Sequence, residues 1–145
     1  MTQLERTQQL YRAYLEQADA LEKSKNPMEG IFGFGGKSAD HPCHEQFIKD
    51  LEALLAAFRQ EGINSADLRD ALALVFFAPQ AHQDPVSIYW MLIAAQSVTP
   101  GIIPLLSKDD AEALYTQYAQ AYPRRVRLPA QKKVAQALEK AAKGS

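Results

Sequence analysis

Five side chains able to hold a metal ion stand close together in the sequence: Asp40, His41, Cys43, His44 and Glu45. Carboxylate, imidazole and thiolate groups are the usual ligands of zinc and related ions. If a helix starts near residue 42, Cys43 and His44 diverge, because successive helical residues point about 100° apart. The sequence therefore predicts Asp40, His41, His44 and Glu45, on the outer side of the helix, as the candidate zinc ligands. They lack the paired Cys or His spacing of a well-specified zinc site.

Cys43 is the only cysteine of the chain, so no internal disulfide can form. Thiols in the first turn of a helix are more acidic than usual, and the neighbouring His41 or His44 could act as a base. A metal- or thiol-dependent enzyme or sensor using Asp40, His41, Cys43 and His44 is therefore one function to weigh. The same helical register places Cys43 beside Phe47, which favours a buried, structural cysteine.

A glycine-rich segment precedes this cluster and contains the triplet Gly36-Lys37-Ser38. A phosphate-binding Walker A loop would need glycine five positions before Gly36, and Ile31 stands there. A dinucleotide fingerprint that begins at Gly33 fails as well, because its last glycine would fall on Ser38. The pattern predicts no nucleotide cofactor.

Large apolar residues alternate with the glycines of this segment, unlike in a flexible linker. The segment is predicted to be a glycine-rich surface loop whose rings pack on the body of the protein. Phe32, Phe34 and Lys37 are its candidates for contact with a protein partner.

A second distinctive segment is basic and lies near the end of the chain. Residues 123–145 contain seven Lys or Arg and one Glu, a net charge of +6, whereas residues 26–122 contain five against twelve, a net charge of −7. Arg124, Arg125 and Arg127 are candidate partner-binding residues, followed by Lys132 and Lys133.

Two alternatives apply to the basic segment. It could bind nucleic acid, with Tyr118 and Tyr122 as stacking platforms, although the chain as a whole carries a net charge of only −1. Its arginines could instead pair with acidic residues of the same chain, such as Asp109 and Glu112.

The elements that must position these residues are helices, because apolar side chains recur at spacings of three and four. Asn64 with Asp67, and Ser107 with Asp110, are typical of helix starts. Helices are expected over residues 3–25, 42–61, 64–79, 86–97, 107–122 and 128–143, with a short helical turn near 102–106. The predicted fold is a single all-α domain, 1–145, a compact bundle of about six helices with short antiparallel connections. The third and fourth helices are expected nearest the centre, since 86–97 is apolar nearly all round.

The first residues show no apolar core of a signal peptide, and the longest apolar run, 86–95, is too short to span a membrane. These observations predict a cytoplasmic protein. No motif points to a family, and none of the catalytic patterns survives. The expected function is therefore non-catalytic binding of a protein partner, as an accessory or immunity-like module, with the oligomeric state left open.

Overall fold

The computed structural model describes residues 2–24, 42–60, 64–83 and 86–144. Within these ranges it contains six α-helices and no strand, which confirms the all-α bundle. The α-helices are α1 (Gln3–Ser24), α3 (Pro42–Gln60), α4 (Ser65–Ala81), α5 (Val86–Ala94), α6 (Lys108–Ala121) and α7 (Pro129–Ala142). The short 3-10 helices are η2 (Ala95–Val98), η3 (Ile103–Leu105) and η4 (Arg124–Val126). The glycine-rich segment, with Phe32, Phe34 and Lys37, lies outside the described residues.

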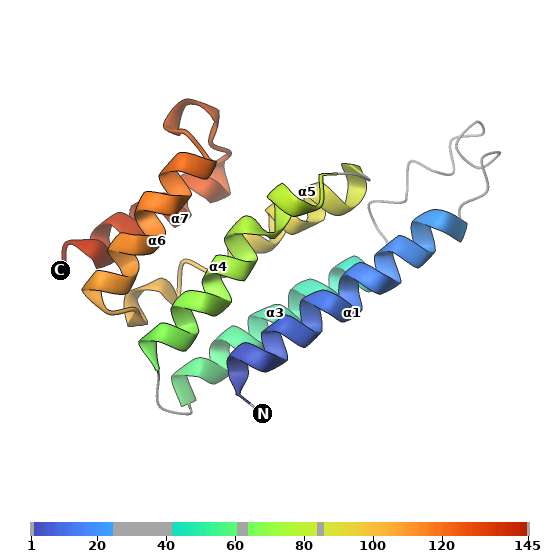
Figure 1. The fold of residues 1–145 in the computed structure, drawn as a ribbon, viewed down its shortest axis with the longest axis horizontal. Coiled ribbons are helices and arrows are strands. Elements are labelled where there is room, and N and C mark those ends of the chain that lie inside the picture. Colours follow the sequence, from blue (N-terminus) through green and yellow to red (C-terminus); the bar gives the residue numbers. More distant parts are fainter. Residues whose placement is uncertain (1, 25–41, 61–63, 84–85, 145) are drawn as a thin grey trace.

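Helices α1 and α3 form an antiparallel pair along one side of the molecule (Figure 1). Their contact is aromatic: Phe47 of α3 stacks on Tyr14 of α1, with ring centroids 4.1 Å apart, and meets the edge of Tyr11 at 4.9 Å. All three rings are buried. Offset and edge-to-face ring pairs stabilise such contacts beyond the area they bury, so this cluster fixes the register of α1 on α3.

Helix α4 is the centre of the bundle and packs against α1, α5 and α6 (Figure 1). Its buried residues recur at helical spacing on more than one face, and include Leu68, Leu72, Val75 and Phe76. This confirms the predicted core face of the third helix. The helix continues two residues past Pro79. Proline lacks a backbone N–H donor, but a proline in the last turn removes only one hydrogen bond of the helix.

The fourth helix is less central than its composition predicts. Helix α5 buries Ile88, Leu92 and Ile93 but leaves Val86 59 % exposed and Trp90 52 % exposed. After Ala94 the chain tightens into η2, whose Gln96 is fully buried. The expectation that this helix is one of the two nearest the centre is therefore wrong: α5 lies at one end of the bundle (Figure 1), and Val86 and Trp90 on its outer face are exposed.

Helices α6 and α7 form a second antiparallel pair. The side chain of Ser107 caps α6 by accepting a hydrogen bond from the Asp110 backbone N–H at 3.2 Å, and Asn64 caps α4 in the same way. Both predicted caps are confirmed. Helix α7 faces the bundle with Val134, Ala135 and Leu138.

One polar cluster joins the starts of α4 and α6. The hydroxyls of Ser65 and Ser107 both donate to the carboxylate of Asp110, and Arg69 donates to its other oxygen at 2.9 Å. The hydroxyl of Ser65 also accepts from the backbone N–H of Ser107 at 2.8 Å. These hydrogen bonds, that of Ser65 first, hold the pKa of Asp110 below its usual value. The cluster supplies acceptors for the backbone N–H groups of Ser107 and Asp110 at the start of α6, so its chemistry is accounted for by capping.

Among the described residues, no helix combines the length and the apolar composition that a membrane span requires.

Candidate functional site

The exposed large apolar residues of the described chain gather in one region. They are Val86 and Trp90 on α5, and Val126 and Leu128 in the connection between α6 and α7, with exposures of 59, 52, 61 and 40 %. Val86 and Trp90 are four residues apart and therefore share a face of α5. A clustered apolar surface of this kind commonly marks a site of interaction, whereas single exposed apolar residues need no explanation.

Three of these four residues line one cavity of about 290 Å³, which we call the Trp90 groove. Four helices and one connection contribute its walls: the end of α4, the face of α5, the end of α6, residues 123–128 and the start of α7. Its lining residues are Pro79, Gln80, Gln83, Tyr89, Trp90, Ile93, Ala121, Tyr122, Val126, Leu128 and Gln131. Eight of these eleven residues are apolar or aromatic and three are glutamines, so the groove combines apolar side chains and rings with polar amide groups, as ligand-binding sites often do.

The floor of the groove rests on a buried hydrogen-bond network. Gln96 of η2 accepts a hydrogen bond from the Tyr118 hydroxyl at 2.7 Å and donates to the Tyr122 hydroxyl at 3.2 Å. The Tyr122 hydroxyl in turn donates to the backbone carbonyl of Phe76 in α4. The network therefore ties η2, α4 and α6 together beneath the groove, and Tyr122 belongs to both. Satisfied buried networks of this kind hold side chains in one arrangement.

Burial raises the pKa of Tyr122 to about 12 from an ordinary value of 10.0, and nearby Tyr89 contributes in the same direction, while the hydrogen bond from Gln96 opposes the shift. Because the folded state holds this proton more tightly, the resulting stability is complete below pH 10 and is lost as the pH rises toward 12. We expect the free energy of unfolding to fall over that interval. Urea unfolding at several alkaline pH values measures it.

Burial also raises the pKa of Tyr11 and Tyr118. Several tyrosines therefore contribute to the fall in the free energy of unfolding of the wild type at alkaline pH. The variant Tyr122→Phe removes the contribution of Tyr122. Its free energy of unfolding should therefore fall less steeply with pH than that of the wild type. Identical slopes for the two proteins would contradict the assignment to Tyr122.

Three of the predicted basic residues lie in the connection that forms one wall of the groove. Arg124, Arg125 and Arg127 alternate with the groove residues Val126 and Leu128 in the same connection. Arg127 is held in place, since its Nε donates to the backbone carbonyl of Tyr122 at 2.9 Å. The connection therefore presents apolar and cationic side chains side by side.

The arginines do not form the predicted pairs with Asp109 and Glu112. Those acids lie in the first turn of α6, whereas the arginines follow its last turn. A 14-residue helix separates its ends by about 20 Å. The predicted stacking role of the tyrosines is also wrong, because Tyr118 is fully buried and Tyr122 is 7 % exposed.

A second, basic cavity of about 270 Å³ is lined partly by residues of the same connection, and we call it the Arg127 pocket. It is lined by Arg124, Arg127, Lys132, Ala135, Gln136 and Glu139. The fold thus brings together three of the five predicted cations, whereas Arg125 and Lys133 do not line it.

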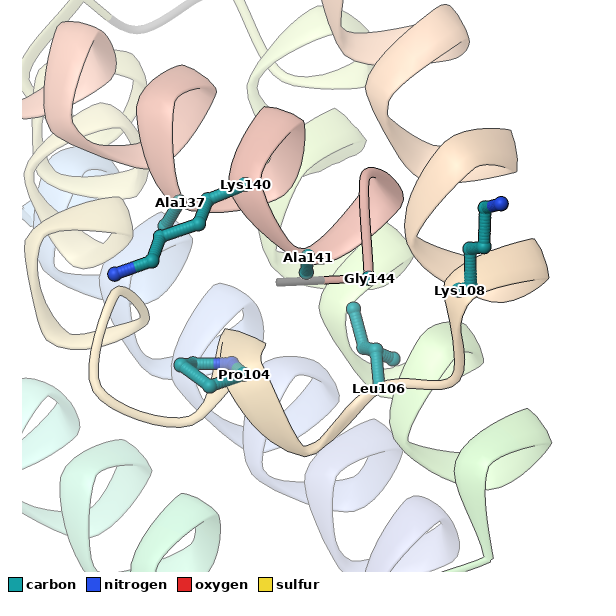
Figure 2. Close-up of a pocket in the computed structure, with 7 residues that line it drawn as sticks. All are labelled: Pro104, Leu106, Lys108, Ala137, Lys140, Ala141 and Gly144. Carbon is teal, nitrogen blue, oxygen red and sulfur yellow. The ribbon is translucent and has the colours of Figure 1, made fainter.

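A cavity of about 560 Å³ lies under the end of α7 (Figure 2). Pro104, Leu106, Ala137 and Ala141 form its apolar part, and Lys108 has its ammonium group directed away from Ala141. Among the described residues that line this cavity there is no aromatic ring and no large exposed apolar side chain. Lysines near a helix C-terminus are accounted for by the helix dipole. The Trp90 groove is therefore the stronger candidate.

The predicted zinc ligands are only partly within the described residues. His44 is 2 % exposed, and its Nδ1 forms a 2.9 Å hydrogen bond with the hydroxyl of Tyr14 on α1. Glu45 is exposed and pairs with Lys49 at 3.1 Å. The expected outward position of His44 beside Glu45 is therefore wrong. His44 precedes Phe47 by three residues and Leu51 by seven, and this spacing assigns it to the core face of α3.

Asp40, His41 and the side chain of Cys43 lie outside the described residues, so zinc binding or thiol chemistry at this end of α3 stays a prediction. In the part of the chain that the structure describes, no group of three or more potential ligands is found. Sequence reasoning turned His44 outward, away from the inner face of α3. The signal that could have corrected it is the run 44, 47, 51, 55 and 58, which matches a helical stripe better.

Sequence reasoning weighed Tyr89, Trp90 and Met91 as lining of a ligand pocket but favoured a core position for them, and it did not single out Val126 or Leu128 as surface residues. Composition alone gave no signal for them, because apolar residues in an apolar helix or beside prolines are typical of a core. A comparison with protein-family models, with curated proteins and with solved structures finds no match to this chain.

Proposed function

We propose that this protein is a non-catalytic binding module that holds an acidic, amphipathic segment of a protein partner in the Trp90 groove. The observation that carries the proposal is the gathering of Val86, Trp90, Val126 and Leu128 beside a row of arginines. Apolar side chains of the segment would fill the groove, as in helix-in-groove recognition.

Charge supports an acidic occupant. No acidic residue occurs in the sequence between Glu112 and Glu139, whereas five cations do. Among the described residues, none of those five forms an ion pair. Uncompensated cations at the rim of an apolar site increase the association rate with acidic partners and disfavour basic ones.

Aliphatic walls favour a protein over a nucleic acid. Nucleic-acid platforms combine cations with aromatic rings for base stacking. Among the described residues, Trp90 is the one aromatic ring in the set of large exposed apolar side chains. Of the other rings in the groove, Tyr89 is partly buried and Tyr122 is 7 % exposed, whereas the exposed lining residues Val126 and Leu128 are aliphatic. Burial of such groups by apolar side chains of a peptide contributes about 25 cal/mol per Å², which a phosphate backbone cannot supply.

Trp90 is the only tryptophan of the chain, so its fluorescence reports on the groove directly. The probe is a synthetic helical peptide with leucine on one face and glutamate on the other. We expect a saturable blue shift of Trp90 emission that weakens as salt is added. The same peptide with lysine in place of glutamate should bind far more weakly.

The variant Val126→Ser/Leu128→Ser keeps the reporter and removes apolar groove walls, and it should weaken peptide binding by about tenfold or more. Both residues are exposed, so the fold should tolerate the change, which circular dichroism checks. Lys140→Gln is the control, because it removes a cation from the cavity in Figure 2 and leaves the groove intact.

Three results would overturn the proposal. They are no Trp90 response to the acidic peptide, a saturable response to a single-stranded DNA oligonucleotide in its place, and a response that appears only in a Phe32→Ser/Phe34→Ser variant. The last result would identify the chain's own glycine-rich segment as the occupant.

A further inference from the structure

The Arg127 pocket concentrates positive charge that the described chain does not neutralise. Arg124, Arg127 and Lys132 line it, and none of them forms an ion pair within the described ranges. The single acid of the pocket, Glu139, is engaged by Lys143 at 3.1 Å. Three cations therefore face one carboxylate that already has a partner.

The guanidinium of Arg127 is held in place for binding. Its Nε donates to the Tyr122 carbonyl at 2.9 Å, and the side chain is only partly exposed. The two terminal nitrogens remain available for a second, bidentate contact. A guanidinium restrained in this way loses less side-chain entropy on binding an anion, and its planar fork matches carboxylate and phosphate oxygens.

The number of cations favours a phosphoryl group over a carboxylate. A carboxylate has two oxygens and a single charge, whereas a phosphate monoester has three terminal oxygens and a charge of about −1.5 to −2. Two guanidinium groups and one ammonium group can each take one of those oxygens. The amide of Gln136, also in the lining, supplies a further donor.

We infer that the Arg127 pocket is a phosphoryl-binding subsite for a phosphorylated side chain carried by the segment that docks in the Trp90 groove. The inference rests on the proposed function for the source of the phosphoryl group. The two cavities share the 123–128 connection, with Val126 and Leu128 on the groove and Arg124 and Arg127 on the pocket. One bound segment can therefore reach both.

The first experiment uses inorganic phosphate as the probe at about pH 8, where phosphate is largely dianionic. Nuclear magnetic resonance of the ¹⁵N-labelled full chain follows the Nε–H signal of Arg127 and the amides of Lys132 and Gln136. We expect saturable shifts with phosphate and none with acetate at equal ionic strength. Arg127→Gln should weaken phosphate binding by about tenfold or more.

Arg125→Gln is the matched control, because it removes the same charge from the same connection without altering the pocket lining. Its phosphate affinity should stay within about twofold of the wild type. Equal losses in the two variants, or equal shifts with acetate and phosphate, would show screening of the general charge and overturn the subsite.

The second experiment compares the amphipathic acidic peptide with a version that carries one phosphoserine. The phosphoserine peptide should bind about tenfold more tightly, and Arg127→Gln but not Arg125→Gln should abolish that advantage. A Trp90 response to both peptides with equal affinity would overturn the inference and keep the proposed function. Saturable phosphate shifts without any Trp90 response would support the subsite and contradict the proposed function.

Discussion

Replacing Phe76 by alanine is expected to lower the free energy of unfolding by about 3–5 kcal/mol. Phe76 is fully buried on α4 and meets the ring of Tyr118 of α6 edge to face, with centroids 5.1 Å apart. Its loss leaves a cavity where the central helix contacts α6, and packed interiors relax only partly around such cavities. Urea unfolding followed by circular dichroism measures the change.

The matched control is Phe77→Ala, one residue along the same helix. Phe77 is only partly buried, so its truncation removes less area from the core, and a cost of about 1–2 kcal/mol is expected. Similar costs for the two variants would contradict the central position of the α4–α6 contact.

Replacing Gln96 by leucine is the second large effect, with an expected loss of about 2–4 kcal/mol. Leucine fills most of the space but accepts no hydrogen bond from Tyr118 and donates none to Tyr122. The Tyr118 hydroxyl then remains buried without this acceptor, and the cost of an unsatisfied buried donor exceeds the net gain of an ordinary hydrogen bond. Thermal unfolding and urea unfolding both measure the loss.

The double variant Gln96→Leu/Tyr118→Phe separates the hydrogen bond from the packing. It removes both partners together, so it should recover about 1–2 kcal/mol relative to Gln96→Leu alone. Strictly additive losses would show that the two side chains do not act as a pair. Trp90 emission of the wild type and of these variants shows whether the network also holds the groove in place. Tyr122 connects the two, because it accepts a hydrogen bond from Gln96 and lines the groove.

Local patterns were sufficient for the helices and their ends. Apolar spacing identified the six α-helices of the described chain, and Asn64 and Ser107 identified two caps, since these signals act within one or two turns. The core face of α4 followed from Leu68, Leu72 and Val75 for the same reason. The single-domain organisation, the zinc set and the cytoplasmic location stay predictions.

The candidate site depended on how distant segments pack. The segments that pack against an apolar face decide whether that face is covered. Trp90 and Val126 are therefore surface residues, whereas Tyr118 and Tyr122 lie in the core. His44 turned inward because Tyr14, thirty residues earlier, provides its hydrogen bond. Arg124, Arg127 and Lys132 share a pocket because the connection folds back on α7. Such contacts join residues without any short-range pattern, and spacing along one helix cannot reveal them.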